Sequence, residues 1–228
     1  ILGREPMILR RSDGYIGTLI DDLVTKGTNE PYRMMTSRSE YRLLHRQDNA
    51  DKRLSGIGLR IGLVSEEQYR RVLDKYAAVD AELRRLEKTH IAPSDGINAL
   101  LTARGSAEIS TGSSLADLIR RPQISYRDLA EFDPERPELP RAVTEQAEIS
   151  LKYEGYIKRQ LKQVEEFTRM ESRPLPADID YDAINGLRLE AREKLKKIRP
   201  ENFGQASRLS GVSPADISVL MIYMEGGR

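Results

Sequence analysis

The clearest helical pattern in the 228-residue chain lies in residues 65–88. Apolar residues recur there at intervals of three and four, which places them on one face of a helix, while charged residues fill the other face. That stripe consists of Tyr69, Val72, Leu73, Tyr76, Val79, Leu83 and Leu86. Ser65 and Gln68 have the spacing of a capping box, so the sequence predicts a long helix that begins directly after Ser65.

A second long helix is predicted over residues 140–171, with Pro140 near its first turn. Its apolar stripe consists of Ile149, Tyr153, Tyr156, Ile157, Leu161, Val164 and Phe167. Gly155 lies inside this predicted helix, where glycine costs about 1 kcal/mol relative to alanine. We therefore expect a neighbouring backbone to approach Gly155 closely.

The C-terminal part predicts three short helices over residues 185–198, 203–209 and 213–225. Gly211 ends the second, and Ser213 with Pro214 begins the third. A helix, a tight turn and a helix are typical of DNA-binding proteins, but residues 214–225 contain no Lys or Arg that could meet phosphates.

The last of these helices is apolar on more than one side. It is therefore either buried in its own three-helix unit or shares a face with a partner protein. The candidates for such a face are Ile217, Leu220, Met221 and Met224.

The remaining segments give weaker patterns. Short helices are expected at residues 95–102, 114–120 and 125–132, with Ser114 and Ser125 as N-caps, and at 48–60, with Asp48 as N-cap. Residues 15–25 have helical spacing, and residues 7–9 could form a strand. The glycines at 56, 58 and 62 nearly match a dinucleotide fingerprint, but Ile61 occupies the third glycine position and no strand precedes them. We expect a break between two helices there.

Together these patterns predict a mostly all-α protein, a helical bundle with two long helices and a C-terminal three-helix unit, preceded by a short mixed α/β segment. The predicted boundaries are 1–54, 55–173 and 174–228. No apolar run approaches the roughly 20 residues that cross a bilayer. The chain has no cysteine and only two distant histidines, His45 and His90, which argues against disulfides and a metal site, and no catalytic set is evident.

Positive charge is concentrated in one stretch. The chain carries 37 Lys and Arg against 36 Asp and Glu, a net charge of +1, yet residues 32–60 hold seven bases against three acids. Arginine grips phosphate through a planar fork of donors, and tyrosine rings stack on unpaired bases. The stretch predicts an RNA-contacting surface made by Arg33, Arg38, Arg42, Arg46, Lys52 and Arg53, with Tyr32 or Tyr41 stacking on a base. A solvated, salt-bridged face explains the same composition equally well.

Residues 30–54, with residues 21–28 before them, resemble the signature of the MnmG family, also called glucose-inhibited division protein A. The resemblance continues through Lys152-Tyr153-Glu154-Gly155-Tyr156-Ile157 and closes with residues 204–217. It covers nearly the whole chain and weakens between residues 91 and 113. Several long motifs in the same order make the resemblance specific.

The resemblance implies a function in tRNA modification. Members of the family install a 5-carboxymethylaminomethyl or aminomethyl group on the wobble uridine, using FAD, NADH and a folate-borne carbon. The chain would be the C-terminal portion of such a protein, a piece of a longer cytoplasmic homodimer. Its segment 1–54 would pack on an upstream flavin domain that holds the cofactors and the catalytic cysteines.

The resemblance also ranks the candidate residues. Arg33 and Arg42 match arginines of the family signature and are therefore the first candidates for tRNA contacts. The C-terminal region would bind the GTPase MnmE. By itself the chain is expected to bind no cofactor and to catalyse nothing. Two alternatives stay open: a structural helical adaptor with no direct nucleic-acid contact, and an autonomous enzyme.

Overall fold

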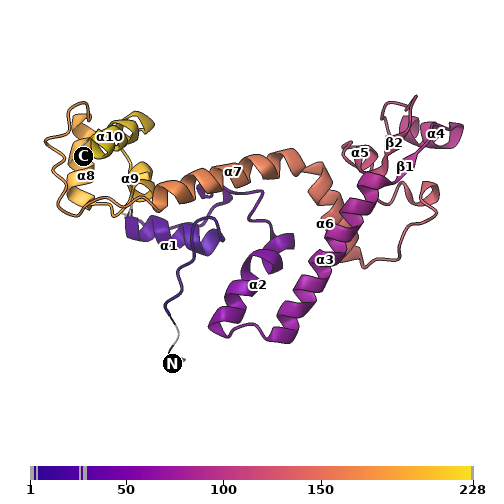
Figure 1. Ribbon diagram of the computed structural model, residues 1–228, viewed down its shortest axis with the longest axis horizontal. Helices are drawn as coiled ribbons and strands as arrows, with labels where there is room; N and C mark the ends of the chain where they lie inside the picture. The colour runs from indigo at the N-terminus through magenta and orange to yellow at the C-terminus, as the bar shows by residue number, and fades with distance from the viewer. Residues whose placement is uncertain (1–2, 4, 26, 28–29, 227–228) are drawn as a thin grey trace. The chain divides into compact units, whose positions relative to one another are not determined.

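The structure is a computed structural model that describes residues 3, 5–25, 27 and 30–226 (Figure 1). Most of these residues are helical, and within them the β-structure is confined to one two-stranded sheet and an isolated bridge. The predicted mostly all-α fold is thereby confirmed. The chain folds into two compact units, which we call unit 1 (Ile1–Met7 with Arg46–Lys158) and unit 2 (Ile8–His45 with Arg159–Arg228).

Unit 1 begins with a helical hairpin of α2 (Ala50–Ile61) and α3 (Glu66–Lys88) (Figure 1). The capping box at the start of α3 is confirmed, because Ser65 Oγ accepts from Gln68 N–H and the Gln68 side chain accepts from Ser65 N–H. The predicted break between two helices in residues 56–62 is confirmed at the last glycine, since α2 runs through Gly56 and Gly58. The chain turns at Gly62, whose φ of 82° lies in the left-handed region that glycine adopts easily.

Asp48 does not cap α2, contrary to the prediction. It lies in a 3₁₀ turn, η2 (Gln47–Asn49), and its carboxylate accepts from the Arg46 and Gln146 side chains instead. Asn49 occupies the N-cap position of α2 and makes no side-chain capping bond. The backbone already turns through η2, so the side chain of Asp48 is free to bind elsewhere.

The rest of unit 1 packs around α3. β1 (His90–Ile91) pairs antiparallel with β2 (Ser113–Ser114), and α4 (Asp95–Ala103), α5 (Leu115–Ile119) and α6 (Arg141–Lys152) complete the unit. The cap predicted at Ser114 is confirmed, since its hydroxyl accepts from the Asp117 N–H. The helix predicted at 125–132 is wrong: turns lead there into the short 3₁₀ helix η3 (Ala130–Phe132). The largest fully buried side chains of unit 1 are Leu86, Ile97, Leu101, Leu115, Leu118, Ile119 and Ile124.

The second long helix is interrupted. The chain leaves helical geometry at Tyr153 (φ −106°, ψ 8°), which separates α6 from α7 (Glu154–Glu171). A Cβ added at Gly155 would meet nothing within 4 Å, so the predicted close backbone approach is wrong. Gly155 lies in the first turn of a new helix rather than in the middle of an old one, where its flexibility costs less.

Unit 2 contains the predicted three-helix arrangement, made by α8 (Leu189–Ile198), α9 (Phe203–Arg208) and α10 (Pro214–Gly226). Gly211 has a φ of 94° after α9, and Pro214 is the first residue of α10, as predicted. The core of unit 2 consists of Leu175, Ile179, Tyr181, Ile184, Leu187, Leu195, Phe203, Ala206, Leu209, Ile217 and Leu220.

Residues 8–45 also belong to unit 2. Residues 7–9 form no strand, but α1 (Tyr15–Thr25) is helical as predicted. An ideal Cβ placed on Gly17 would stand 2.0 Å from the Arg10 carbonyl oxygen, so this position requires glycine. Unit 2 thus joins residues 8–45 to the C-terminal helices, a division that differs from the predicted boundaries at 54 and 173.

Candidate nucleic-acid interface

One buried arginine organises the N-terminal segment of unit 2. The side chain of Arg11 is 3% exposed, and its Nη1 lies 2.7 Å from Asp22 and 3.0 Å from Asp21, both on α1. Its Nη2 lies 2.8 Å from Glu40. Burial alone would lower the pKa of Arg11, but hydrogen bonds to Glu40 and Asp22 outweigh it and raise that pKa. Arg11 is therefore a fixed cation that joins α1 to residues 38–40.

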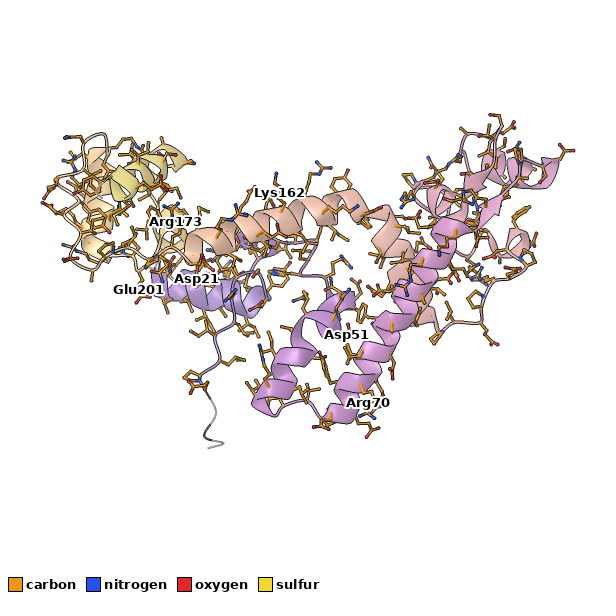
Figure 2. All side chains as sticks on the ribbon, in the orientation of Figure 1. Asp21, Asp51, Arg70, Lys162, Arg173 and Glu201 are labelled. Carbon is orange, nitrogen blue, oxygen red and sulfur yellow. The ribbon has the colours of Figure 1, made fainter. Side chains whose placement is uncertain are left out.

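A second arginine connects this cluster to the C-terminal helices. Arg208 at the end of α9 binds Asp21 on α1 through Nη2 and Glu171 at the end of α7 through Nη1, each at 2.9 Å. Figure 2 shows Asp21 on α1. The Arg208 side chain is only 6% exposed. No sequence pattern indicates these contacts, since Arg208 and Asp21 are 187 residues apart.

The first-ranked candidates lie on the outside of the same segment. Arg33 and Arg42 are both exposed, and neither has a hydrogen-bond or ion-pair partner among the residues that the structure describes. Arg38 is exposed as well, and its guanidinium carbon lies 4.5 Å from the centre of the Tyr32 ring. These three cations are thus directed to solvent rather than to carboxylates.

The three acids inside the basic stretch do little to neutralise the exposed arginines Arg33, Arg38 and Arg42. Glu40 is bound by the buried Arg11, and Asp51 on α2 points toward α3, where it accepts from Lys75 and Tyr76 (Figure 2). Asp48 binds Arg46, two residues before it, at 3.1 Å. The positive charge of the outer face therefore remains available to an anionic ligand.

The backbone on either side of Arg42 is held by a residue that the sequence did not suggest. Gln160 on α7 accepts from the Leu44 N–H at 3.2 Å and donates to the Glu40 carbonyl oxygen at 3.3 Å. His45, 4% exposed, closes the same turn, with Nδ1 2.9 Å from Ser39 Oγ. Arg42 is presented from this fixed turn. No local pattern reveals Gln160, because its partners are 116 and 120 residues away.

Tyr41 is oriented differently from Tyr32. Its side chain is 4% exposed and meets the His45 ring edge-on, with centroids 6.0 Å apart. Burial raises the pKa of Tyr41 to about 12, with Glu40 adding to the effect. That Tyr41 stacks on a base stays a prediction, but in this structure its ring belongs to the interior of unit 2.

The second-ranked candidates lie in unit 1. Arg46 is half-buried beside Asp48, and Lys52 is exposed with Nζ 4.8 Å from the centre of the Tyr76 ring. Arg53 donates to Asn49 Oδ1 at 2.9 Å and to the Arg46 carbonyl oxygen at 3.1 Å. A groove of unit 1 is lined by Lys52, Arg53, Gly56, Ile57, Leu59, Arg60 and Tyr69. The predicted set is thus divided between the two units.

The predicted partner face on α10 is largely turned inward. Leu220 is fully buried and Ile217 is 6% exposed, while Met221 and Met224 pack against the same core. The exposed apolar residues of this helix are Ile222 (69%) and Tyr223 (40%), which line a shallow pocket with Val219, Ala183 and Asn185. Contact of the four predicted residues with a partner stays a prediction, but Ile217 and Leu220 cannot be reached in this structure.

The described residues show little that could hold a cofactor or an ion. Gly56 and Gly58 are helical, so their backbone amides are used within α2 and offer no phosphate cradle. No group of three or more acidic or histidine side chains suited to a metal ion occurs within the residues described. Among the same residues, no helix has both the length and the apolar character that crossing a bilayer requires.

Comparison with known proteins agrees with the sequence motifs. Residues 66–161 match the model of the tRNA modifying enzyme MnmG/GidA C-terminal helical domain, and residues 163–228 match that of the MnmG/GidA C-terminal helical bundle. The chain belongs to the MnmG/GidA family. The join between the two family segments falls inside α7, close to the division between the two units.

Relatives and solved structures extend the match to the whole chain. The tRNA uridine 5-carboxymethylaminomethyl modification enzyme MnmG of Caldicellulosiruptor saccharolyticus is 58% identical over 99% of the chain, and that of Enterococcus faecalis is 56% identical over 100%. A crystal structure of Aquifex aeolicus GidA is similar, with a TM-score of 0.77 and 43% identity over 99% of the chain. The chain spans 36% of the length of the two MnmG relatives and 35% of that GidA chain.

Proposed function

We propose that the chain is the C-terminal tRNA- and partner-binding portion of an enzyme that installs 5-carboxymethylaminomethyl or aminomethyl groups on tRNA wobble uridine. The names of the relatives supply the reaction. The observation that carries the tRNA role of this portion is the exposure of Arg33 and Arg42 without an acidic partner among the described residues. Arg38 supplements them in unit 2, and Arg46, Lys52 and Arg53 form a second contact region in unit 1.

Phosphate binding explains why these arginines are exposed but not loosely attached. An arginine that only stabilises a surface usually pairs with an acid, whereas a phosphate ligand needs donors that are still available in the free protein. The turn that carries Arg42 is fixed by Gln160. A donor fixed in this way loses less conformational entropy when it binds a backbone phosphate.

The test is the binding of tRNA to the 228-residue chain across a series of salt concentrations. Each phosphate contact contributes roughly 0.7–0.9 to the slope of log affinity against log salt. We expect a steep slope for the parent chain and a decrease of about one unit for Arg33→Ala and for Arg42→Ala.

Arg71→Ala is the matched control for both variants. Arg71 is exposed on α3 and pairs with Glu67, so its removal should leave affinity and slope unchanged. A slope that stays the same in Arg33→Ala, Arg42→Ala and the double variant would refute the assignment of these residues to phosphate contacts.

One observation favours the structural adaptor as a second candidate. α1 exposes four large apolar residues along its outer side: Ile16, Ile20, Leu23 and Val24, between 43% and 75% exposed. An apolar helix face of this kind fits docking onto a neighbouring domain, such as the flavin domain expected upstream. The adaptor predicts that the chain binds tRNA weakly and without a steep dependence on salt.

The finer family properties are part of the proposal. We assign the GTPase MnmE to the exposed side of α10, with Ile222 and Tyr223 as contacts, and FAD and NADH to the part of the intact protein outside this chain. The intact protein is proposed to be a cytoplasmic homodimer. Ile222→Asp should abolish binding of the chain to purified MnmE while the fold is kept, because Ile222 is 69% exposed. Flavin absorbance in the purified chain would contradict the cofactor assignment.

A further inference from the structure

Tyr32 and Arg38 form a stacked pair on the outer face of unit 2. The Arg38 guanidinium carbon lies 4.5 Å from the centre of the Tyr32 ring, at the end of the 3₁₀ turn η1 (Thr36–Arg38). Arg38 is exposed and Tyr32 is partly exposed. The pair therefore presents planar, delocalised groups to solvent within the stretch that carries Arg33 and Arg42.

Both members of the pair are fixed by the buried Arg11 cluster. The Tyr32 hydroxyl donates to Asp22 Oδ2 at 2.7 Å, and the other oxygen of Asp22 is bound by Arg11. Arg11 also donates to the Arg38 carbonyl oxygen at 3.3 Å. One buried cation thus sets the position of the ring and of the residue that covers it, so the pair is preorganised before any ligand arrives.

The chemistry of the surroundings favours a nucleobase as the ligand. Unpaired RNA bases stack on aromatic rings and on guanidinium planes, while neighbouring cations bind the phosphates. The residues between the two members are exposed, including Met34 (39%) and Met35 (49%), which add polarisable apolar surface beside the pair. Tyr41 lacks this accessibility, since its ring is 4% exposed.

We propose that the Tyr32–Arg38 pair is a platform on which one unpaired base of the bound RNA stacks. The inference rests on the proposed function and goes beyond it, because it assigns this pair to single-stranded RNA and distinguishes it from the arginines that bind phosphates. Asp22 and Arg11 act as positioning residues that hold the platform without touching the RNA.

The test compares two RNAs with the 228-residue chain: a stem-loop with 2-aminopurine in its unpaired loop, and a fully paired duplex of equal length. The parent should bind the loop more tightly and quench the 2-aminopurine fluorescence. Tyr32→Leu should lower the affinity for the loop roughly tenfold, change the affinity for the duplex little, and abolish the quenching. Tyr32→Phe keeps the ring and should keep most of the preference for the loop.

Arg38→Lys separates stacking from charge. It retains the positive charge but loses the planar group, so the affinity for the loop should fall several-fold while the salt slope stays the same. Arg33→Lys is the matched control: because Arg33 is assigned only to phosphates, this change should alter binding of loop and duplex alike. Arg38 is exposed, so its replacement leaves the folded core intact.

The possible results separate this inference from the proposed function. Steep salt-dependent binding of both RNAs, with no preference for the loop and no quenching, would retain the phosphate contacts and overturn the platform. Equal loop affinity in Tyr32→Leu, Arg38→Lys and the parent would also overturn it and leave the pair a stack within the protein. Absence of RNA binding by the parent would overturn the proposed function and this inference together.

Discussion

Two groups of arginines in unit 2 have the same chemistry and opposite surroundings. Arg11 and Arg208 are 3% and 6% exposed and bind four carboxylates between them, whereas Arg33 and Arg42 are exposed and bind none among the described residues. Arg11 and Arg208, the inner pair, join distant segments of the chain through their ion pairs. Arg33 and Arg42, the outer pair, have charges that remain available to a ligand. Residue type and sequence position alone therefore do not indicate which arginines serve the fold and which serve recognition.

Replacement of the buried Arg11 should lower the stability of the fold most. Arg11→Ala leaves Asp21, Asp22 and Glu40 without their shared cation, and breaking a buried pair from one side costs about 3–5 kcal/mol. We expect that decrease in the free energy of unfolding by urea, followed by far-UV circular dichroism. A decrease below about 1 kcal/mol would show that the cluster does not stabilise unit 2.

Asp216 tests the same principle at the start of α10, with a defined dependence on pH. Its carboxylate accepts from Arg188 Nη2 at 2.6 Å and from the Ser213 side chain and N–H, and it is 2% exposed. The hydrogen bond from Arg188 lowers the pKa of Asp216, against the effect of burial. Because the pKa is lowered in the folded state, the stability it contributes is present at neutral pH and is lost as the pH falls below about 4.

Asp216→Asn should therefore cost about 1–2 kcal/mol at pH 7 and progressively less at acidic pH. Urea unfolding of the variant and the parent at pH 7 and at an acidic pH measures the difference in their free energies of unfolding. Asp178→Asn is a suitable control, because Asp178 is exposed and has no ion-pair partner among the described residues. A difference between Asp216→Asn and the parent that does not change with pH would contradict the assignment.

Gln160→Leu should lower the stability less than Arg11→Ala does and more than substitutions of Arg33 or Arg42 do. It removes two hydrogen bonds to the turn that carries Arg42, each worth roughly 0.5–1.5 kcal/mol in a partly exposed site. We expect a loss of about 1 kcal/mol in stability and a several-fold loss of tRNA affinity, since Arg42 would be less well fixed. The exposed Gln163→Leu on the same helix should change neither quantity.

The outer arginines should have the smallest effect on stability. Arg33→Ala and Arg42→Ala should change the free energy of unfolding by no more than about 0.5 kcal/mol, because their side chains have no partner within the described residues. Any loss of tRNA affinity in these variants can then be attributed to binding. A loss of stability near that of Arg11→Ala would place them with the structural arginines.

Local signals in the sequence were sufficient for much of the helical framework. The capping box at Ser65, the cap at Ser114 and the glycine and proline at 211 and 214 each act over a few residues, and the structure contains all of them. The break at Tyr153 was missed because the apolar stripe continues through it without a proline or a capping residue.

The candidate site was less accessible to sequence reasoning. The basic stretch was visible as a local excess of charge, but two of its three acids have partners outside the stretch, as the pairs of Glu40 with Arg11 and Asp51 with Lys75 show. The contribution of Gln160 depends on contacts more than 100 residues apart in the chain, which no periodicity reports. The family resemblance favoured a partner face on α10, but its residues were chosen by apolar character. In a helix that is apolar all round, this criterion does not separate Leu220 in the core from Ile222 outside it.

The lack of a side chain at Gly17 affects the ion pairs of Arg11 and the surface that they hold in place. Because the carbonyl of Arg10 lies directly over Gly17, the main chain of the N-terminal segment meets α1 with nothing between them. This close approach fixes the position of the next residue, Arg11, so that its side chain reaches Asp22. Even a single methyl group there would push the two segments apart and move the arginine away from its acids, so the smallest possible substitution, Gly17→Ala, would loosen a surface whose own residues had not been changed.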